Sequence, residues 1–208
     1  MKALQSLQNP IINHATALAL LHSYARPNDK ISELIKQNQL ISLKRGLYAI
    51  SNSSEQIIPL AANHLYGPSY LSSHWALGYY GFITERVSLI SSMCVGKSQQ
   101  FDTPIGLFNY HHLPLAYYST GITRVQQSHR AFMIATPEKA LADILVSTRG
   151  LRIQSTKAMT SYLLDNLRFD ENDLSTLNST DFIAFTEHGF KSGLLHHLSH
   201  AVRNLSND

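Results

Sequence analysis

The sequence has few of the residues that mark secreted, disordered or membrane-spanning proteins. Its single cysteine, Cys94, excludes an internal disulfide, so a reducing compartment fits best. Charged residues make up 15% of the chain and hydrophobic residues 44%, a balance that predicts a folded core. No apolar run approaches the ~18 residues of a membrane span, and the N-terminal apolar stretch lacks the cleavage site of a signal peptide. We therefore expect a folded cytoplasmic protein that does not enter the membrane.

The usual patterns of catalytic and cofactor sites are also missing. There is no glycine-rich phosphate loop and no readable Ser-His-Asp or Cys-His order. Glu85, Asp102 and Glu138 are scattered, whereas a metal-dependent nuclease needs clustered carboxylates around its metal. We predict no catalytic residue and no cofactor, and we expect that the protein is not an enzyme.

Eleven histidines raise the question of a metal site. His196, His197 and His200 have the i, i+3 and i, i+4 spacing that places imidazoles on one face of a helix. No glutamate of an HExxH motif and no cysteine accompanies them, so we interpret them as a surface or interface cluster and predict no metal ligand.

The charge is unevenly distributed along the chain. Residues 1–50 contain six basic and two acidic side chains, a net +4, whereas residues 51–208 contain 11 basic and 12 acidic side chains, a net −1. A basic first quarter is typical of a domain that binds a polyanion.

The first 50 residues have the pattern of a winged helix-turn-helix. An apolar helix is predicted over 10–24, followed by a break at Arg26–Asn28 and a second helix that continues through Asn38. Two short apolar runs within 40–50 then flank a basic pair and a glycine, which predicts a β-hairpin. We predict that the second helix and the hairpin tip bind DNA, through Lys30, Ser32, Lys36, Gln37, Asn38, Lys44 and Arg45.

The remainder is expected to form a second, larger domain over 56–208, after a polar linker at 51–54. Helices are predicted over 57–65 and 69–81. The region 86–134 reads as strands of an antiparallel sheet, with a hairpin at 99–110 and a strand at 113–118, and 136–205 reads as helical. The expected fold class is α+β: an N-terminal winged helix-turn-helix, a mixed antiparallel-sheet and helix domain, and a helical C-terminal region.

Two features of this second domain have alternative interpretations. Lys139, near the start of a helix opened by Thr136 and Pro137, has either a structural role or a contact with a partner or nucleic acid. The aromatic residues between positions 75 and 82 are expected mainly in the core, with a partner-binding surface as the alternative.

Three segments, taken in order, resemble the AbiE-type antitoxins that accompany nucleotidyltransferase-like toxins. They are LISLKRGLYAI at 40–50, YLSSHWALGYYGF at 70–82 and ATPEKALADIL at 135–145. The resemblance spans roughly residues 30–147, and it does not extend past Gly150. The N-terminal part is also one helix short of a full three-helix module, unless the first predicted helix is divided in two.

This resemblance implies a phage-defence antitoxin with two activities. Its winged helix would bind double-stranded operator DNA and repress its own operon, and its larger domain would neutralise a nucleotidyltransferase-like toxin. Two other functions remain open: a metal-dependent nucleic-acid-processing enzyme that uses Glu85 or Asp102, and an interaction module that holds a partner without binding DNA. The operator, the oligomeric state and the presence of an adjacent toxin are left undetermined.

Overall fold

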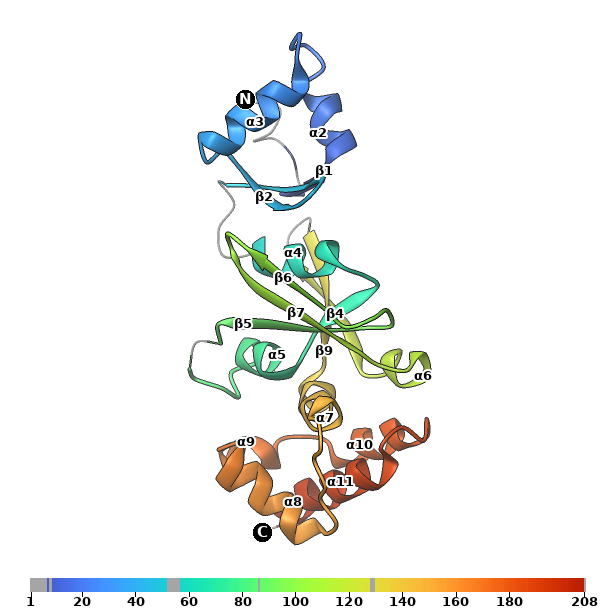
Figure 1. The fold of residues 1–208 in the computed structure, drawn as a ribbon. Helices are drawn as coiled ribbons and strands as arrows, with labels where there is room; N and C mark the ends of the chain where they lie inside the picture. The colour runs from blue at the N-terminus through green and yellow to red at the C-terminus, as the bar shows by residue number, and fades with distance from the viewer. Residues whose placement is uncertain (1–6, 8, 52–56, 86, 128–129, 208) are drawn as a thin grey trace.

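A computed structural model describes residues 7, 9–51, 57–85, 87–127 and 130–207 (Figure 1). The chain runs from an N-terminal unit of two helices on a small sheet, through a central six-stranded sheet, to a group of C-terminal helices. In the described residues no helix combines the length and the apolar character needed to cross a bilayer.

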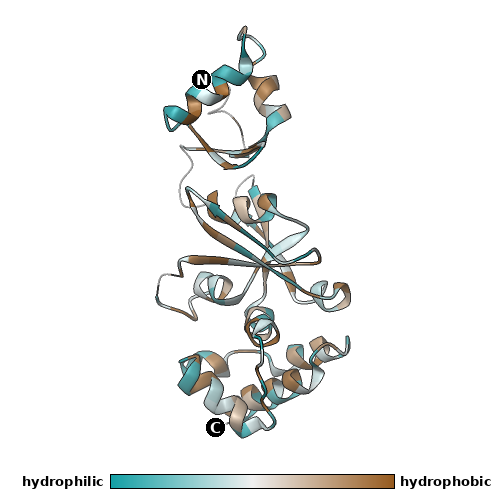
Figure 2. Cartoon of the chain, in the orientation of Figure 1, coloured by the Kyte–Doolittle hydropathy of each residue, from teal (hydrophilic) through white to brown (hydrophobic). Residues whose placement is uncertain are grey.

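The N-terminal unit places two helices on a three-stranded antiparallel sheet of order β1-β3-β2. Figure 2 shows hydrophobic colour on its strands and mostly hydrophilic colour on α3. Its elements are β1 (Ile11–Asn13), α2 (His14–Leu20), α3 (Pro27–Lys36), β2 (Leu40–Lys44) and β3 (Leu47–Ile50).

The predicted helix over 10–24 is corrected to a strand followed by a short helix. Ile11–Asn13 pairs with β3, and the Asn13 side chain accepts a hydrogen bond from the amide of Thr16, so it caps α2. Apolar periodicity does not separate these two cases, because the strand is defined by a partner 34 to 38 positions further along the chain.

The small sheet is buried on both faces, because its side chains alternate between two cores. Ile12, Tyr48 and Ile50 pack under α2 and α3. Leu47 and Ala49 belong instead to the large core that continues into the second domain. The proposed linker at 51–54 lies, apart from Ser51, outside the described residues, yet the regions on either side of it share one apolar interface.

The central sheet has the strand order β6-β7-β5-β4-β9-β8. It is mixed: β5 and β7 are parallel, as are β4 and β9, and the other pairs are antiparallel. The strands are β4 (Ser69–Leu71), β5 (Leu89–Cys94), β6 (Gln99–Thr103), β7 (Gly106–His112), β8 (Ile122–Gln127) and β9 (Arg130–Ala135), and the helices of this unit are α4 (Ile57–Leu65), α5 (Ser73–Tyr79), α6 (Leu115–Tyr118) and α7 (Pro137–Ser147).

Several predictions for this region are confirmed and others are corrected. The helix over 57–65 and the hairpin within 99–110 are confirmed. The helix over 69–81 begins only at Ser73, because 69–71 pair with β5 and β9 as β4. The strand over 113–118 is instead the short helix α6, and the expected antiparallel sheet is mixed.

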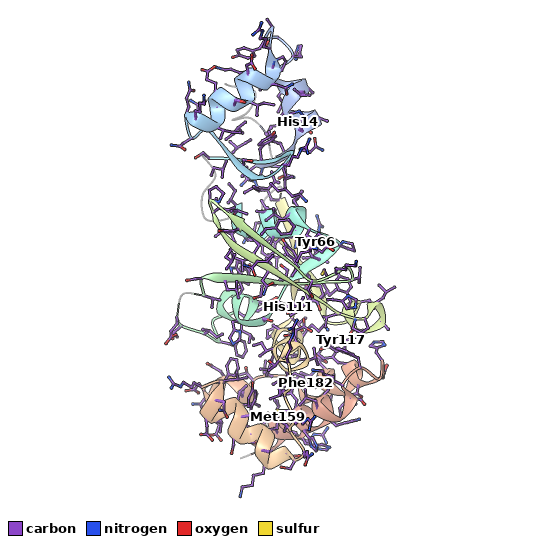
Figure 3. All side chains as sticks on the ribbon, viewed as in Figure 1. His14, Tyr66, His111, Tyr117, Met159 and Phe182 are labelled. Carbon is purple, nitrogen blue, oxygen red and sulfur yellow. The ribbon has the colours of Figure 1, made fainter. Side chains whose placement is uncertain are left out.

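The C-terminal region is helical, as predicted, and packs against α7 (Figure 1). In Figure 3, Met159 lies among these helices and Tyr117 lies close to α7. The elements are α8 (Thr156–Ser161), the π-helical turn η1 (Tyr162–Asn166), α9 (Glu171–Ser175), α10 (Ser179–Thr186) and α11 (Ser192–Asn207).

Candidate nucleic-acid interface

Helix α3 is held on the small sheet by its apolar face. Pro27 occupies the first helical position, where its missing N–H costs nothing, and Ile31 and Leu34 are buried beneath the helix. The opposite face is exposed and polar, and its residues are Asn28, Asp29, Ser32, Glu33, Lys36 and Gln37. It contains three of the residues predicted to bind DNA, Ser32, Lys36 and Gln37.

Two of the predicted DNA-binding residues on α3 are engaged within the helix. The Lys30 ammonium lies 2.9 Å from the Glu33 carboxylate and 5.3 Å from the centre of the Tyr24 ring. The hydrogen bond from Lys30 lowers the pKa of Glu33. The Ser32 hydroxyl donates to the carbonyl of Asn28 at 3.1 Å.

The end of α3 presents one free cation. Lys36 is the last helical residue and is exposed, while the Gln37 amide donates to Glu33 at 2.9 Å. Asn38 lies past the helix with a φ of 55°, in the left-handed region that asparagine tolerates better than most residues. The prediction that Asn38 belongs to the helix is therefore wrong, because it turns the chain into β2.

The hairpin residues Lys44 and Arg45 have different surroundings. The Lys44 ammonium donates to the carbonyl of Leu65, at the C-terminus of α4, and lies 5.6 Å from the centre of the Phe101 ring. A cation is stabilised at that end of a helix. Arg45 is exposed at the turn beside Gly46, whose φ of 79° is readily adopted by glycine.

The charges on α3 cancel, because the helix contains two basic residues, Lys30 and Lys36, and two acidic residues, Asp29 and Glu33. Arg26 lies 3.7 Å from Asp29 in an exposed ion pair. Within residues 9–51, the exposed cations that have neither an ion pair nor a hydrogen bond are Lys36 and Arg45. The +4 of the first quarter thus supplies fewer free cations than the sequence indicates.

A second polar cluster is fully buried where α7 meets the central sheet. The Lys139 ammonium lies 2.9 Å from the Asp143 carboxylate, and both side chains have no exposed surface. Tyr70 and Ser72 donate hydrogen bonds to the other oxygen of that carboxylate, at 2.9 and 2.7 Å. Lys139 also donates to the carbonyl of Tyr117 at 3.1 Å. In this buried cluster, Tyr70 and Ser72 come from the segment at 70–82, and Lys139 and Asp143 come from the segment at 135–145.

Burial dominates the electrostatics of the cluster. It raises the pKa of Tyr70 and Tyr117 well above the usual value, and the charge of Asp143 acts in the same direction. It lowers the pKa of Lys139, although Asp143 opposes that shift. Of the two interpretations of Lys139, the structural one is correct, because a side chain with no exposed surface cannot contact a partner.

The aromatic helix α5 is only partly in the core. Trp75 stacks on Tyr79 with ring centres 6.1 Å apart, and Tyr79 meets Phe132 edge to face at 5.8 Å. Tyr79 remains 41% exposed, and Trp75, Tyr80 and Phe82 are half-buried. The cluster therefore covers the edge of the core and also presents an aromatic surface.

The residues weighed for metal or nuclease chemistry are dispersed. Asp102 lies on β6, Glu85 lies in the loop after α5, and the Glu138 carboxylate accepts a hydrogen bond from the amide of Asn178 at 3.2 Å. In the part of the chain that the structure describes, no three His, Cys, Asp or Glu side chains gather as metal ligands.

Asp143, Tyr70 and Tyr117 belong to the buried cluster but were not predicted from the sequence as site residues. The available signal was the i, i+4 spacing of Lys139 and Asp143 inside an otherwise apolar helix, a pattern typical of an ion pair. That the pair is buried depends on α6 and β4, which lie far away in the sequence. No protein-family model matches the chain, and a search of curated proteins finds no relative.

Proposed function

We propose that the protein is a DNA-binding regulator of the AbiE-antitoxin type, in which α3 enters the major groove of operator DNA and Arg45 contacts the flanking backbone. The observation that carries the proposal is the exposed polar face of α3, held on its sheet by Ile31 and Leu34 and followed by a hairpin with a free arginine at its tip. The order of two helices joined by a short segment and then a hairpin supports a winged helix-turn-helix.

The positions of the free cations fit this mode of binding. Lys36 ends α3 and Arg45 follows β2 at the turn of the hairpin, so the two free cations come from the two elements that are proposed to contact DNA. Cations on a groove-binding helix and on a neighbouring hairpin are suited to the phosphates that flank the groove.

Lys44 is left out of this interface. Its ammonium already bonds to the Leu65 carbonyl, so contact with a phosphate would break the contact between the hairpin and α4. We assign it to holding the N-terminal unit against the second domain, which we propose serves a toxin partner.

The test is an electrophoretic mobility shift with the protein's own upstream DNA, at low and at physiological ionic strength. We expect Lys36→Glu/Arg45→Glu to abolish the shift, since two phosphate contacts become repulsive. Lys157→Glu/Arg203→Glu is the matched control, because it makes the same change in net charge at exposed positions of α8 and α11. Equal loss of binding in both variants would mean non-specific electrostatics and would contradict the proposal.

The cancelled charge of α3 favours a second candidate function, an interaction module without DNA binding. Under that hypothesis the wild-type protein shifts no upstream DNA at either ionic strength, and Lys36→Glu/Arg45→Glu leaves expression of the operon unchanged. A reporter fused to the upstream region distinguishes the two functions directly.

A further inference from the structure

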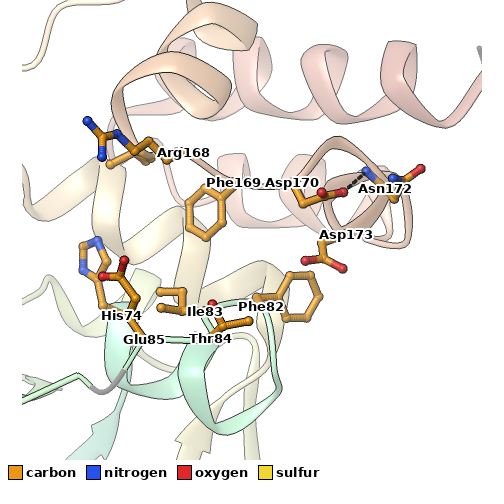
Figure 4. A pocket seen from close by; sticks show the side chains of 11 residues that line it. His74, Phe82, Ile83, Thr84, Glu85, Arg168, Phe169, Asp170, Asn172 and Asp173 are labelled. Carbon is orange, nitrogen blue, oxygen red and sulfur yellow. Dashed lines mark hydrogen bonds between the residues drawn. The ribbon is translucent and has the colours of Figure 1, made fainter.

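A cleft lies between the exit of α5 and the turn that leads into α9 (Figure 4). Its volume is about 690 Å³, within the range of ligand and peptide sites. Half-buried Phe82 and Ile83 and buried Phe169 form its apolar part. The cleft is therefore large enough to seat a bulky side chain together with its neighbours.

The two ends of the cleft differ in charge. Asp170 and Asp173 line one end, whereas Glu85, His74 and Arg168 line the other, where the acid and the arginine offset one another (Figure 4). The carboxylate of Asp170 accepts a hydrogen bond from the backbone amide of Asn172 and so caps α9. Asp173 has no hydrogen bond or ion pair to its carboxylate within the described residues, and it lies at the same end as Phe82.

The segment that forms one wall of the cleft belongs to an acidic part of the sequence. From 162 to 187 the chain contains six acidic side chains and one basic side chain, a net −5 with histidine neutral, in contrast to the +4 of residues 1–50. Glu171 belongs to this field but does not line the cleft. Such a field repels phosphate and attracts a basic protein surface.

We propose that this cleft docks a segment of a protein partner that has a basic side chain next to a bulky apolar one. The apolar side chain packs on Phe82 and Phe169, and the basic side chain pairs with Asp173 against the Phe82 ring. A carboxylate with an aromatic face beside it is a favourable place for a lysine or arginine. A small cation would use the acidic end of the cleft but leave Phe82, Ile83 and Phe169 uncovered, which is why we assign the site to a protein segment.

The inference rests on the partner-binding half of the proposed function, and not on its DNA-binding half. The probe is a fluorescein-labelled peptide with the core Arg-Leu-Arg between alanines, and its counterpart has Glu-Leu-Glu at the same positions. Binding of each peptide to the full chain is measured by fluorescence anisotropy. We expect the wild-type protein to bind the basic peptide and not the acidic one.

Three variants locate the binding. Asp173→Lys replaces an attraction with a repulsion, so we expect the affinity to fall about ten-fold at low salt and less at high salt. Thr84→Trp fills the cleft from an exposed position and is expected to abolish binding. Glu171→Lys, with the same charge change on the same helix but outside the cleft, should change affinity by no more than about two-fold.

Each result decides the proposal. Selective loss in Asp173→Lys and Thr84→Trp supports it. Equal loss in Asp173→Lys and Glu171→Lys overturns it, because the net charge of residues 162–187 as a whole, and not the cleft, would then attract the peptide. No binding of the basic peptide, or equal binding of the acidic one, overturns it as well. All three variants should still shift upstream DNA like the wild type, so a failed DNA-binding proposal and a failed cleft give different results.

Discussion

Removing one member of the buried Lys139–Asp143 pair should strongly destabilise the protein. In Lys139→Met the Asp143 carboxylate stays buried and keeps only its bonds from Tyr70 and Ser72. In Asp143→Asn the Lys139 ammonium is left with the Tyr117 carbonyl and the rings around it. Because each change leaves an uncompensated buried charge, we expect each to lower the free energy of unfolding by about 3–5 kcal/mol.

The double variant Lys139→Met/Asp143→Asn separates the interaction from the two sites. It has no buried charge, and the amide oxygen at 143 still accepts from Tyr70 and Ser72. We expect its loss to be smaller than the sum of the single losses by about 2 kcal/mol or more. Free energies are measured by urea unfolding followed by circular dichroism, with the denaturant slope checked for each variant.

An exposed pair of the same kind provides the control. Lys30 and Glu33 are also 2.9 Å apart on a helix, but their side chains are 20% and 48% exposed. Lys30→Met should therefore leave the urea midpoint almost unchanged, because water solvates Glu33 once its partner is removed. Equal effects of the two lysine variants, or additive effects of the changes at Lys139 and Asp143, would refute burial as the cause of the large loss.

Three further predictions concern stability. Gly121→Ala combines a φ of 67° with a new Cβ 2.7 Å from the Cβ of Lys139, so it should lower the free energy of unfolding by about 2–4 kcal/mol. Gly150 has a φ of 71° but lies in open space, so Gly150→Ala should lower it by about 1 kcal/mol. Equal effects of the two variants in urea unfolding would argue against crowding at position 121. Lys44→Met should lower the free energy of unfolding by about 1 kcal/mol and Arg45→Met should leave it unchanged, since Lys44 alone bonds to the end of α4; identical urea midpoints would remove Lys44 from the domain contact. Tyr70 and Tyr117 have a raised pKa in the folded protein, so the same tyrosines ionise at lower pH in the unfolded chain. The stability that they contribute is present below about pH 10 and is lost as the pH rises above it, at up to about 1.4 kcal/mol per pH unit for each group. Tyr70→Phe should reduce this alkaline loss in urea unfolding at stepped pH, and an unchanged pH dependence would contradict the assignment.

Some elements of the fold have local causes and others depend on distant contacts. The hairpin within 40–50 and the helix that begins after Thr136 are predicted correctly, because a basic turn with glycine and a hydroxyl cap before proline act over a few residues. The exposure of Lys36 and Arg45 also follows from local pattern. Of the candidate interface, these two residues are the part for which the sequence was sufficient.

The rest depends on contacts that no local pattern specifies. Ile11–Asn13 and Ser69–Leu71 are strands because distant strands pair with them, and the same residues read as helix when considered alone. Lys44 has the sequence context of a wing tip, yet its ammonium donates a hydrogen bond to the Leu65 carbonyl at the end of α4. The sequence alone determined the Thr136 cap of α7, the turn at Gly46 and the uneven charge. Only the tertiary structure decided which lysine is free, which is docked and which is buried with Asp143, because pairing and burial depend on segments brought together by folding.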